Sequence, residues 1–454
     1  MLQQRCRSFT TARPSPVVRQ RIRINPLRPP IRLNSTEENL ADPKPTRDAL
    51  FIEEAASPVE ECVPFRDRDG NLLEVMCCDY GFRSKDRMYG DEFGKIPDSI
   101  WSLAVQNFKY EFNELRSAIR QDAFRGISEQ NPATSILGKA WYWIGSKIVN
   151  SLSKLDQKLE EQEFLSKIEV PEISPMVFTD SIDGGEMTSV VAIPEDECMQ
   201  IRAKLNGLKL SNDAVWDRER ARIAEGDGVT APWYINLAYY TLCYLLDVLF
   251  NNRPLQRFWF LETVARMPYF SYISMLHLYE SLGWWRQGSI LRKVHLAEEW
   301  NELHHLQIME SLGGDQYWSD RFLGQHAAIF YYWILLLFYV FSPRLAYNFS
   351  ELIEAHAVDT YGEFVDANKE LLQSLPPPFV AVQYYRGDDL YLFDEFQTSG
   401  VKTETRRPEC NNLYDVFVNI RDDEGEHVKT MKGCQDETIV RDLDVQAKAK
   451  TSSD

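Results

Sequence analysis

The chain has 454 residues, of which 44% are hydrophobic and 26% are charged, and its formal net charge is −18. This composition is that of a globular protein, because a disordered chain would hold fewer apolar residues and a polytopic membrane protein fewer charged ones. The acidic balance argues against a nucleic-acid partner, which would select a basic face. The charge is uneven: residues 1–36 contain eight arginines and no acidic residue, so the rest of the chain carries −26.

The leader of residues 1–36 is also rich in Ser, Thr and Pro. A basic segment without acidic residues is typical of an organelle transit peptide, and this one lacks the apolar core of a secretory signal. The alternative is a disordered basic arm that contacts an anionic membrane. We predict a transit peptide, and its Arg-rich character suits mitochondrial import as well as plastid import.

The eight cysteines show no paired spacing along the chain. They are Cys6, Cys62, Cys77, Cys78, Cys198, Cys243, Cys410 and Cys434. Neither a disulfide scaffold nor a zinc site is predicted from this distribution. We interpret the adjacent Cys77 and Cys78 as ordinary thiols rather than as a redox switch.

Residues 37–228 form an acidic N-terminal region that we expect to be partly flexible. Within it, residues 97–125 and 135–165 show the apolar spacing of amphipathic helices. The second of these either lies on a membrane surface or packs against a neighbouring helix, and packing is the commoner outcome for such a stripe. The Gly- and Asp-containing segment 225–232 is a candidate linker.

A helical domain is predicted at residues 229–434, followed by a flexible tail at 435–454. From residue 233 the apolar residues follow helical spacing. The predicted breaks fall at Asn251–Pro254, Gly283, Gly313–Gly314, Pro343 and Pro376–Pro378. A polar patch at 380–410 is expected to be strand-like or looped. All seven histidines lie between residues 277 and 427, which places the chemistry in this domain.

Two segments, 233–250 and 327–341, are apolar enough to raise the question of a membrane. The second has fifteen residues, which is fewer than the roughly 18–20 needed to cross a bilayer. The first contains Asn236 and Asp247. Both are rich in Tyr and Trp, which favour an aromatic core or the membrane–water interface. They are either buried bundle helices or a helical surface that dips into one leaflet.

Two Glu-x-x-His pairs stand out among the candidate functional residues. Positions i and i+3 share one face of a helix, so each pair can present a carboxylate and an imidazole to the same metals. The spacing alone is weak evidence, but each pair lies in an apolar stripe, where a buried carboxylate requires a compensating partner. Two further glutamates follow apolar runs in the same way. The six candidate ligands are Glu262, Glu302, His305, Glu354, Glu424 and His427.

Four helices, of which two give one Glu and two give Glu-x-x-His, follow the ligand rule of ferritin-like di-iron bundles. We therefore predict an all-α fold: a ferritin-like four-helix di-iron bundle with two additional membrane-facing helices, preceded by an extension to which no structure is assigned. Four carboxylates would offset two ferrous ions. His305 is preferred over His304 because only His305 lies three residues after Glu302.

Tyr361 lies two turns after Glu354 and on the same face of its helix. A phenol there can donate a proton and an electron at the metals, although a packed aromatic residue is the commoner role of a buried tyrosine. His277, His295 and His356 are candidates for proton relay or for contacts with the ligands, and packing histidines are the alternative.

Four blocks of the helical domain resemble the plastid terminal oxidases, the plastid branch of the alternative oxidases. They are LETVARMPYFSYISMLHLYESLGWWR at 261–286, HLAEEWNELHHLQIMESLGGD at 295–315, NFSELIEAHAVDTYGEF at 348–364 and NLYDVFVNIRDDEGEH at 412–427. The patch DLYLFDEFQTS at 389–399 is similar to the insertion that separates this branch from mitochondrial relatives.

The resemblance implies a non-haem di-iron enzyme that oxidises plastoquinol and reduces O2 to water without pumping protons. It places the protein on the stromal side of the thylakoid as a monotopic membrane protein, and related oxidases suggest a homodimer. By motif, the same six residues would bind two iron ions and Tyr361 would be the redox-active catalytic tyrosine. Arg257, Leu261 and Thr360 would line the quinol pocket.

Three rival functions remain at this point. One is a di-iron mono-oxygenase or hydroxylase that inserts oxygen into a lipid-like ring. Another is a mitochondrial ubiquinol alternative oxidase, since the leader does not distinguish the two organelles. The last is a non-enzymatic iron-binding or membrane-scaffold protein whose helices only pack.

Overall fold

The computed structural model describes residues 73, 75–76, 78–82, 98–120, 136–168, 195–285, 289–386 and 408–440. The predicted transit peptide at 1–36, the patch at 389–399 and the tail beyond residue 440 lie outside the described residues. The domain boundaries drawn from the sequence stay predictions.

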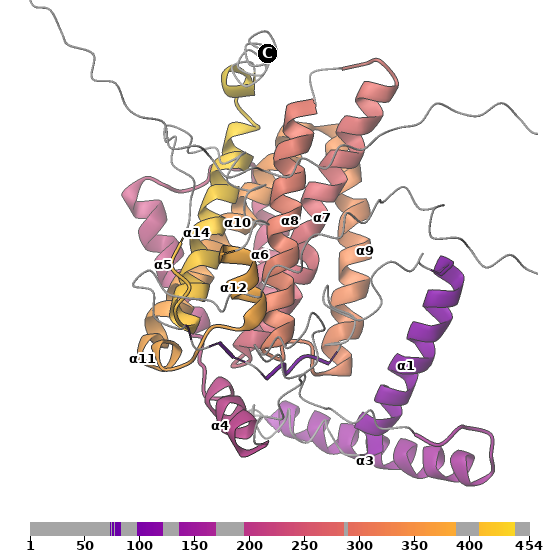
Figure 1. The fold of residues 1–454 in the computed structure, drawn as a ribbon. Coiled ribbons are helices and arrows are strands. Elements are labelled where there is room, and N and C mark those ends of the chain that lie inside the picture. The colour runs from indigo at the N-terminus through magenta and orange to yellow at the C-terminus, as the bar shows by residue number, and fades with distance from the viewer. Residues whose placement is uncertain are drawn as a thin grey trace, which may run out of the picture. The chain divides into compact units, whose positions relative to one another are not determined.

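Four long helices form the central bundle (Figure 1). They are α7 (Pro254–Ser281), α8 (Ser289–Ser311), α10 (Pro343–Ala367) and α14 (Leu413–Gly433). Helix α7 packs against α8, and α10 packs against α14. Among the described residues there is no strand, only an isolated bridge between Met76 and Pro378. The predictions of an all-α fold and of a four-helix bundle are confirmed.

Two further helices flank the bundle, as the sequence predicts. Helix α9 (Trp318–Phe341) packs along α7, and α6 (Trp233–Leu249) contacts α10. Their inner sides are buried through residues such as Tyr239 and Leu335. The opposite sides of both helices carry large exposed apolar side chains.

The helices of the bundle end where the sequence predicts breaks. Proline is the first residue of both α7 and α10, a position at which its missing N–H is not needed. Gly313 adopts a φ of 86° after α8. A Cβ on Gly314 would lie 2.6 Å from Trp259 Cβ, so this turn admits only glycine beside α7.

The expectation of a strand-like or looped segment from residue 380 is wrong at its start. Residues Phe379–Arg386 form helix α12, which packs against α8. Val380, Tyr384 and Tyr385 are buried there. The residues that follow α12 are polar, and this composition hid the short apolar run of Phe379–Arg386 in the sequence pattern. Burial of that run against α8 favours the helix.

The N-terminal region contributes four described helices. They are α1 (Ile100–Arg120), α3 (Ile136–Glu161), α4 (Glu195–Leu205) and α5 (Asn212–Glu225). The two expected amphipathic helices correspond to α1 and α3, which are joined by ion pairs from Arg116 to Asp156 (2.6 Å) and from Arg120 to Glu160 (2.6 Å). Helix α5 packs against α10, and a short helix α11 (Lys369–Gln373) follows α10.

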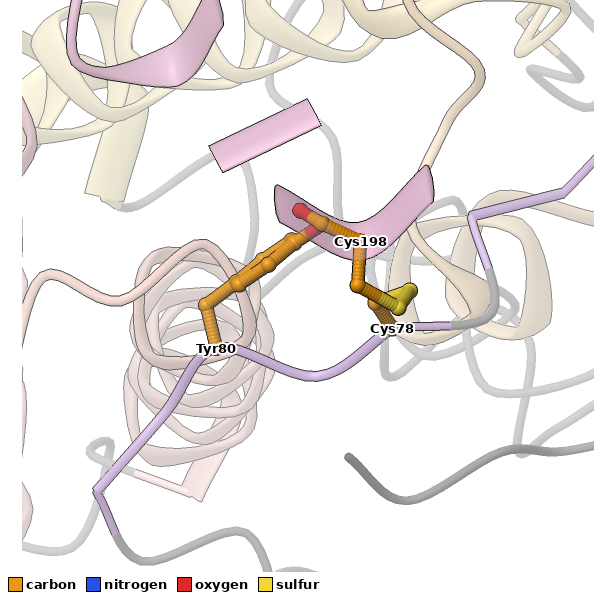
Figure 2. Close-up of a disulfide and its surroundings, with 3 residues drawn as sticks. All are labelled: Cys78, Tyr80 and Cys198. Atoms are coloured by element: carbon orange, nitrogen blue, oxygen red, sulfur yellow. A yellow bond between two sulfur atoms is a disulfide. The ribbon is translucent and has the colours of Figure 1, made fainter. Parts of the chain in front are cut away.

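A disulfide between Cys78 and Cys198 ties an N-terminal segment to α4 (Figure 2). Their Cα atoms are 5.9 Å apart although 120 residues separate them. The hydroxyl of Tyr80 donates to the carbonyl oxygen of Cys198 at 2.8 Å. The interpretation of Cys78 as an ordinary thiol is therefore wrong, because spacing along the chain carries no information about so distant a pair. In the chain-entropy model such a cross-link stabilises the fold by about 5 kcal/mol.

Candidate metal centre

The six predicted ligand residues converge inside the bundle. Helix α7 supplies Glu262, α8 supplies Glu302 and His305, α10 supplies Glu354, and α14 supplies Glu424 and His427. All six side chains are buried, and the most exposed residue among them, Glu354, is 3% exposed. Helical i, i+3 spacing places both side chains of each Glu-x-x-His pair on the inner face of their helix.

These side chains form two overlapping groups that could each hold a metal ion. The first group is Glu262, Glu302, His305 and Glu424, and the second is Glu302, Glu354, Glu424 and His427. Within each group the ligand atoms lie within 4.8 Å of one another. Glu302 and Glu424 belong to both groups. Such an arrangement could hold two adjacent metal ions, with Glu302 and Glu424 available to both.

The polar atoms of the cluster do not satisfy one another. His305 Nδ1 lies 3.4 Å from Glu424 and 3.7 Å from both Glu262 and Glu302, distances too long or marginal for hydrogen bonds. Buried oxygens of these three glutamates, and His305 Nδ1 itself, have no hydrogen-bond partner. Leaving such groups unpaired costs several kcal/mol in total. A pair of divalent cations fits this set, because it would satisfy the orphaned atoms and offset four carboxylates.

The electrostatics of the cluster without metal require bound protons. Burial and then Glu302 raise the pKa of Glu262 well above its usual range, and burial and then Glu424 do the same for Glu354. Burial lowers the pKa of His427, but the carboxylates beside it, Glu302 at 2.9 Å from Nδ1 and Glu424, outweigh burial and raise that pKa well above its usual value. Metal ions would replace these protons.

Two tyrosines donate hydrogen bonds to the outer glutamates of the cluster. Tyr361 on α10 donates to Glu262 on α7, while Tyr269 on α7 donates to Glu354 on α10 at 2.8 Å. Burial and then the charge of Glu262 raise the pKa of Tyr361 well above its usual value, so the phenol keeps its proton. Tyr269 is not among the site residues predicted from the sequence. The signal was present, since each tyrosine follows the glutamate of its own helix by seven residues.

Asp423 orients His305, one of the six predicted ligands. Its carboxylate accepts from His305 Nε2 at 3.1 Å, from Asn301 Nδ2 at 3.1 Å and from the Tyr385 hydroxyl at 2.9 Å. The proton on Nε2 therefore points at Asp423, and the lone pair of Nδ1 faces the cluster, where it could bind a metal ion. Asp423 and Asn301 were also missed, although each directly precedes a ligand glutamate in the chain.

The histidine that was not chosen as a ligand is engaged elsewhere. His304 Nδ1 lies 2.7 Å from the carbonyl oxygen of Trp300, and its ring stacks on Tyr384 with centroids 4.1 Å apart. His295 contacts Glu298 and Tyr347, and His277 lies near Arg292. His356, the third candidate for relay, lines a cavity beside the cluster.

A cavity of about 240 Å³ connects the cluster with the side of α6 and α9. Its wall is mostly apolar and includes Leu261, Phe330 and Ile334, and it reaches Glu262 and Tyr361. Of the residues assigned to a quinol pocket, only Leu261 lines the wall directly. Arg257 and Thr360 lie behind it.

Both of the recessed residues contact His356, which does line the cavity. Thr360 Oγ1 donates to the carbonyl oxygen of His356 at 2.7 Å. An Nη of Arg257 lies 3.5 Å from His356 Nε2. Arg257 could therefore act on anything bound in the cavity through this imidazole, whereas Thr360 contacts only the backbone of His356.

The outer surface beside the cavity is apolar. Exposed side chains include Trp233, Leu237 and Tyr244 on α6, and Phe330, Trp333 and Phe341 on α9. Among the described helices, only α9 is long and apolar enough to cross a membrane, and 22% of its most apolar window is buried. Length and composition alone do not distinguish a crossing helix from one that lies along a surface.

Four helices that surround a buried cluster of four glutamates and two histidines define a bundle of the ferritin-like class, suited to two adjacent metal ions. Residues 233–436 match the family described as alternative oxidase. This part of the chain is an alternative oxidase domain.

The relatives of this domain include chloroplastic and mitochondrial proteins, and the chain differs in its identity to the two. The chain is 59% identical over 191 residues to a chloroplastic/chromoplastic ubiquinol oxidase 4 of Arabidopsis thaliana. The aligned region covers 42% of this chain and 54% of the relative. The chain is 29% identical over 182 residues to a mitochondrial ubiquinol oxidase of Mangifera indica, covering 40% and 50%. The chain thus spans about half the length of the curated relatives it matches. The difference in identity supports the plastid branch.

Proposed function

We propose that the protein is a quinol:oxygen oxidoreductase of the plastid branch, which oxidises plastoquinol and reduces O2 to water without pumping protons. The observation that carries this proposal is the cavity, which joins an apolar outer face to the carboxylate–histidine cluster. A quinol is an apolar molecule with a redox-active ring, so it suits an apolar entrance that ends at metal ligands.

The proposed cofactor is a pair of iron ions held by the six predicted ligands. Carboxylate oxygens and imidazole nitrogens, without thiolates, are donors that suit non-haem iron in both of its common oxidation states. When bound, the irons supply the redox chemistry that passes electrons from the quinol to O2. The two groups of ligand atoms support this number of ions because they share Glu302 and Glu424.

The protein's own residues would exclude water and hold a proton at the cluster. Leu261, Phe330 and Ile334 keep the cavity apolar up to the ligands. Tyr361 lines the inner end of the cavity and holds its proton at Oη beside Glu262. Its ring is fixed by stacking on Phe258, with centroids 4.3 Å apart. We assign Tyr361 the role of the catalytic tyrosine because, of the two tyrosines that donate to a predicted ligand, it is the one that lines the cavity.

The exposed apolar face of α6 and α9 is the proposed membrane contact. Monotopic insertion into one leaflet explains why large side chains are exposed on one side of each helix while Tyr239, Leu335 and Tyr339 are buried on the other. The greater identity to a chloroplastic relative supports a plastid location, and within the plastid the proposed place is the stromal side of the thylakoid. A homodimer follows only from the resemblance and stays a prediction.

Quinol-dependent oxygen uptake together with iron content tests this proposal. The full chain, loaded with iron and reconstituted in liposomes, should consume O2 with decyl-plastoquinol at about two quinols for each O2, as a four-electron reduction requires. The uptake should be insensitive to cyanide and should yield water. Insertion of labelled oxygen into an organic product would favour the mono-oxygenase. Two bound irons without any quinol-dependent uptake would favour a non-enzymatic protein.

A further inference from the structure

Helix α5 lies upstream of the alternative oxidase domain, yet its polar face contacts the wall of the cavity. Asn212, Trp216 and Glu219 follow one another at helical spacing and share one side of α5. Each makes a polar or aromatic contact with a residue of α6, α7 or α10. Val215 and Trp216 of α5 also pack against the apolar core, but Glu219 is a buried carboxylate that apolar packing does not explain.

Glu219 holds the imidazole that lines the cavity. Its Oε2 accepts a hydrogen bond from the Tyr239 hydroxyl at 2.7 Å and lies 3.2 Å from His356 Nδ1. Trp216 covers the same imidazole, with ring centroids 5.1 Å apart. Because Nδ1 faces a carboxylate, it carries a proton, and the ring is fixed with Nε2 on its opposite edge, 3.5 Å from an Nη of Arg257.

The same face of α5 also holds Arg257. Asn212 Oδ1 accepts from an Nη of Arg257 at 2.8 Å, and Asp247 accepts from that Nη at 2.7 Å. Trp216 Nε1 in turn donates to Asp247 at 2.8 Å. Arg257, which is fully buried, therefore depends on α5 for part of its hydrogen bonding.

We propose that α5 is part of the quinol-binding site, with Glu219 as the positioning residue that fixes His356 at the cavity wall. The proposal rests on the proposed function, because it requires the cavity to take a quinol ring. In a wall that is otherwise mostly apolar, a fixed imidazole supplies a polar contact that orients the ring oxygens. Burial of the Glu219 carboxylate costs free energy. The proposed positioning of the His356 imidazole explains why a carboxylate is buried there.

Binding of the oxidised product tests the proposal without turnover. Decyl-plastoquinone would be titrated calorimetrically into the full-length, iron-loaded protein in detergent micelles. Glu219→Ala should weaken binding about tenfold, which corresponds to about 1.4 kcal/mol. Glu219→Gln should give a smaller loss, because its amide oxygen still accepts one hydrogen bond. Glu225→Gln, an exposed glutamate at the end of the same helix, is the matched control and should leave the Kd unchanged.

The outcomes separate the inference from the proposed function. Absence of quinone binding to the wild-type protein would contradict the proposed function itself. Wild-type binding that is unchanged in Glu219→Ala would overturn only the role of Glu219. If the alanine variant does not fold, Glu219→Gln decides: a raised KM for quinol with an unchanged iron content and melting temperature supports positioning. A lowered melting temperature with an unchanged KM would show that Glu219 is only a structural anchor.

Discussion

The centre of the bundle and the α6–α9 face depart from an ordinary soluble protein in opposite directions. The centre buries four carboxylates, whereas the face exposes large apolar side chains such as Trp233 at 76% and Phe330 at 73%. Each arrangement is unfavourable for the isolated chain in water. Each would become favourable with a different proposed partner: metal ions for the buried carboxylates and an apolar phase for the exposed face. Because the cavity joins them, we interpret the buried carboxylates and the exposed apolar face as parts of one functional site.

The largest effect is expected from removing a glutamate that belongs to both groups of predicted ligands, which tests the proposed role of the buried carboxylates. Glu302→Ala should reduce bound iron from about two per chain to less than one, and quinol oxidase activity by more than about 100-fold, since even residues that only orient ligands contribute 10- to 100-fold. Glu262→Ala leaves the second group of ligands complete and should keep about one iron. Iron content by mass spectrometry and oxygen uptake measure both effects.

Glu426→Gln provides the control for this pair. Glu426 lies in the same helical turn as the ligands of α14, but it pairs with Lys429 at 2.7 Å instead of facing the cluster. It should retain full iron content and activity. Equal loss of one iron in Glu302→Ala and Glu262→Ala would show that Glu302 is not shared.

A smaller effect is expected from the carboxylate that orients His305. Asp423→Asn keeps the size of the side chain but weakens its acceptance of hydrogen bonds from His305, Asn301 and Tyr385. Metal affinity should fall about 10- to 100-fold, as measured by competition with a chelator. Asp422→Asn, its exposed neighbour that pairs with Arg421, should have no effect. An unchanged affinity in Asp423→Asn would mean that the ring of His305 is fixed by packing alone.

The part of the centre that the sequence predicts follows from local periodicity. One helical turn is enough to make neighbours of Glu302 and His305, and of Glu424 and His427. The spacing of each pair therefore predicts that its two side chains share a helix face. The bundle follows from apolar spacing and from prolines and glycines at the helix ends. The role of these residues as iron ligands is still a proposal, but their convergence is a property of the fold.

The parts that sequence reasoning missed are set by contacts between distant segments. Cys78 meets Cys198 across 120 residues, and Glu219 meets His356 across 137. Neither partner lies in a periodic pattern that points to the other. Tyr269 is an intermediate case, because its spacing from Glu262 is local while its hydrogen-bond partner lies on another helix. Local chemistry is readable from the chain, and the pairing of segments is not.

The outer face offers the mildest test, since changes there leave the centre intact. Trp333→Gln combined with Phe341→Gln removes two side chains that are 64% and 79% exposed on α9. Burial of a large apolar side chain contributes roughly 1.5–3 kcal/mol. Allowing for partial insertion, binding to liposomes should weaken roughly 10- to 100-fold. Flotation of the protein with liposomes of neutral galactolipid measures the change, while iron content should stay constant.

Trp101→Gln on α1 is the control, because this tryptophan is 80% exposed but lies outside the α6–α9 face. If it weakens binding as much as the double change on α9, general surface hydrophobicity and not this face drives the association. If only the α9 variant loses binding, its oxidation of a lipid-embedded quinol should fall in parallel, while oxidation of a water-soluble short-chain quinol stays near the wild-type rate. That divergence would separate access to the substrate from chemistry at the cluster, as expected if the exposed apolar face serves delivery and the buried carboxylates serve reaction.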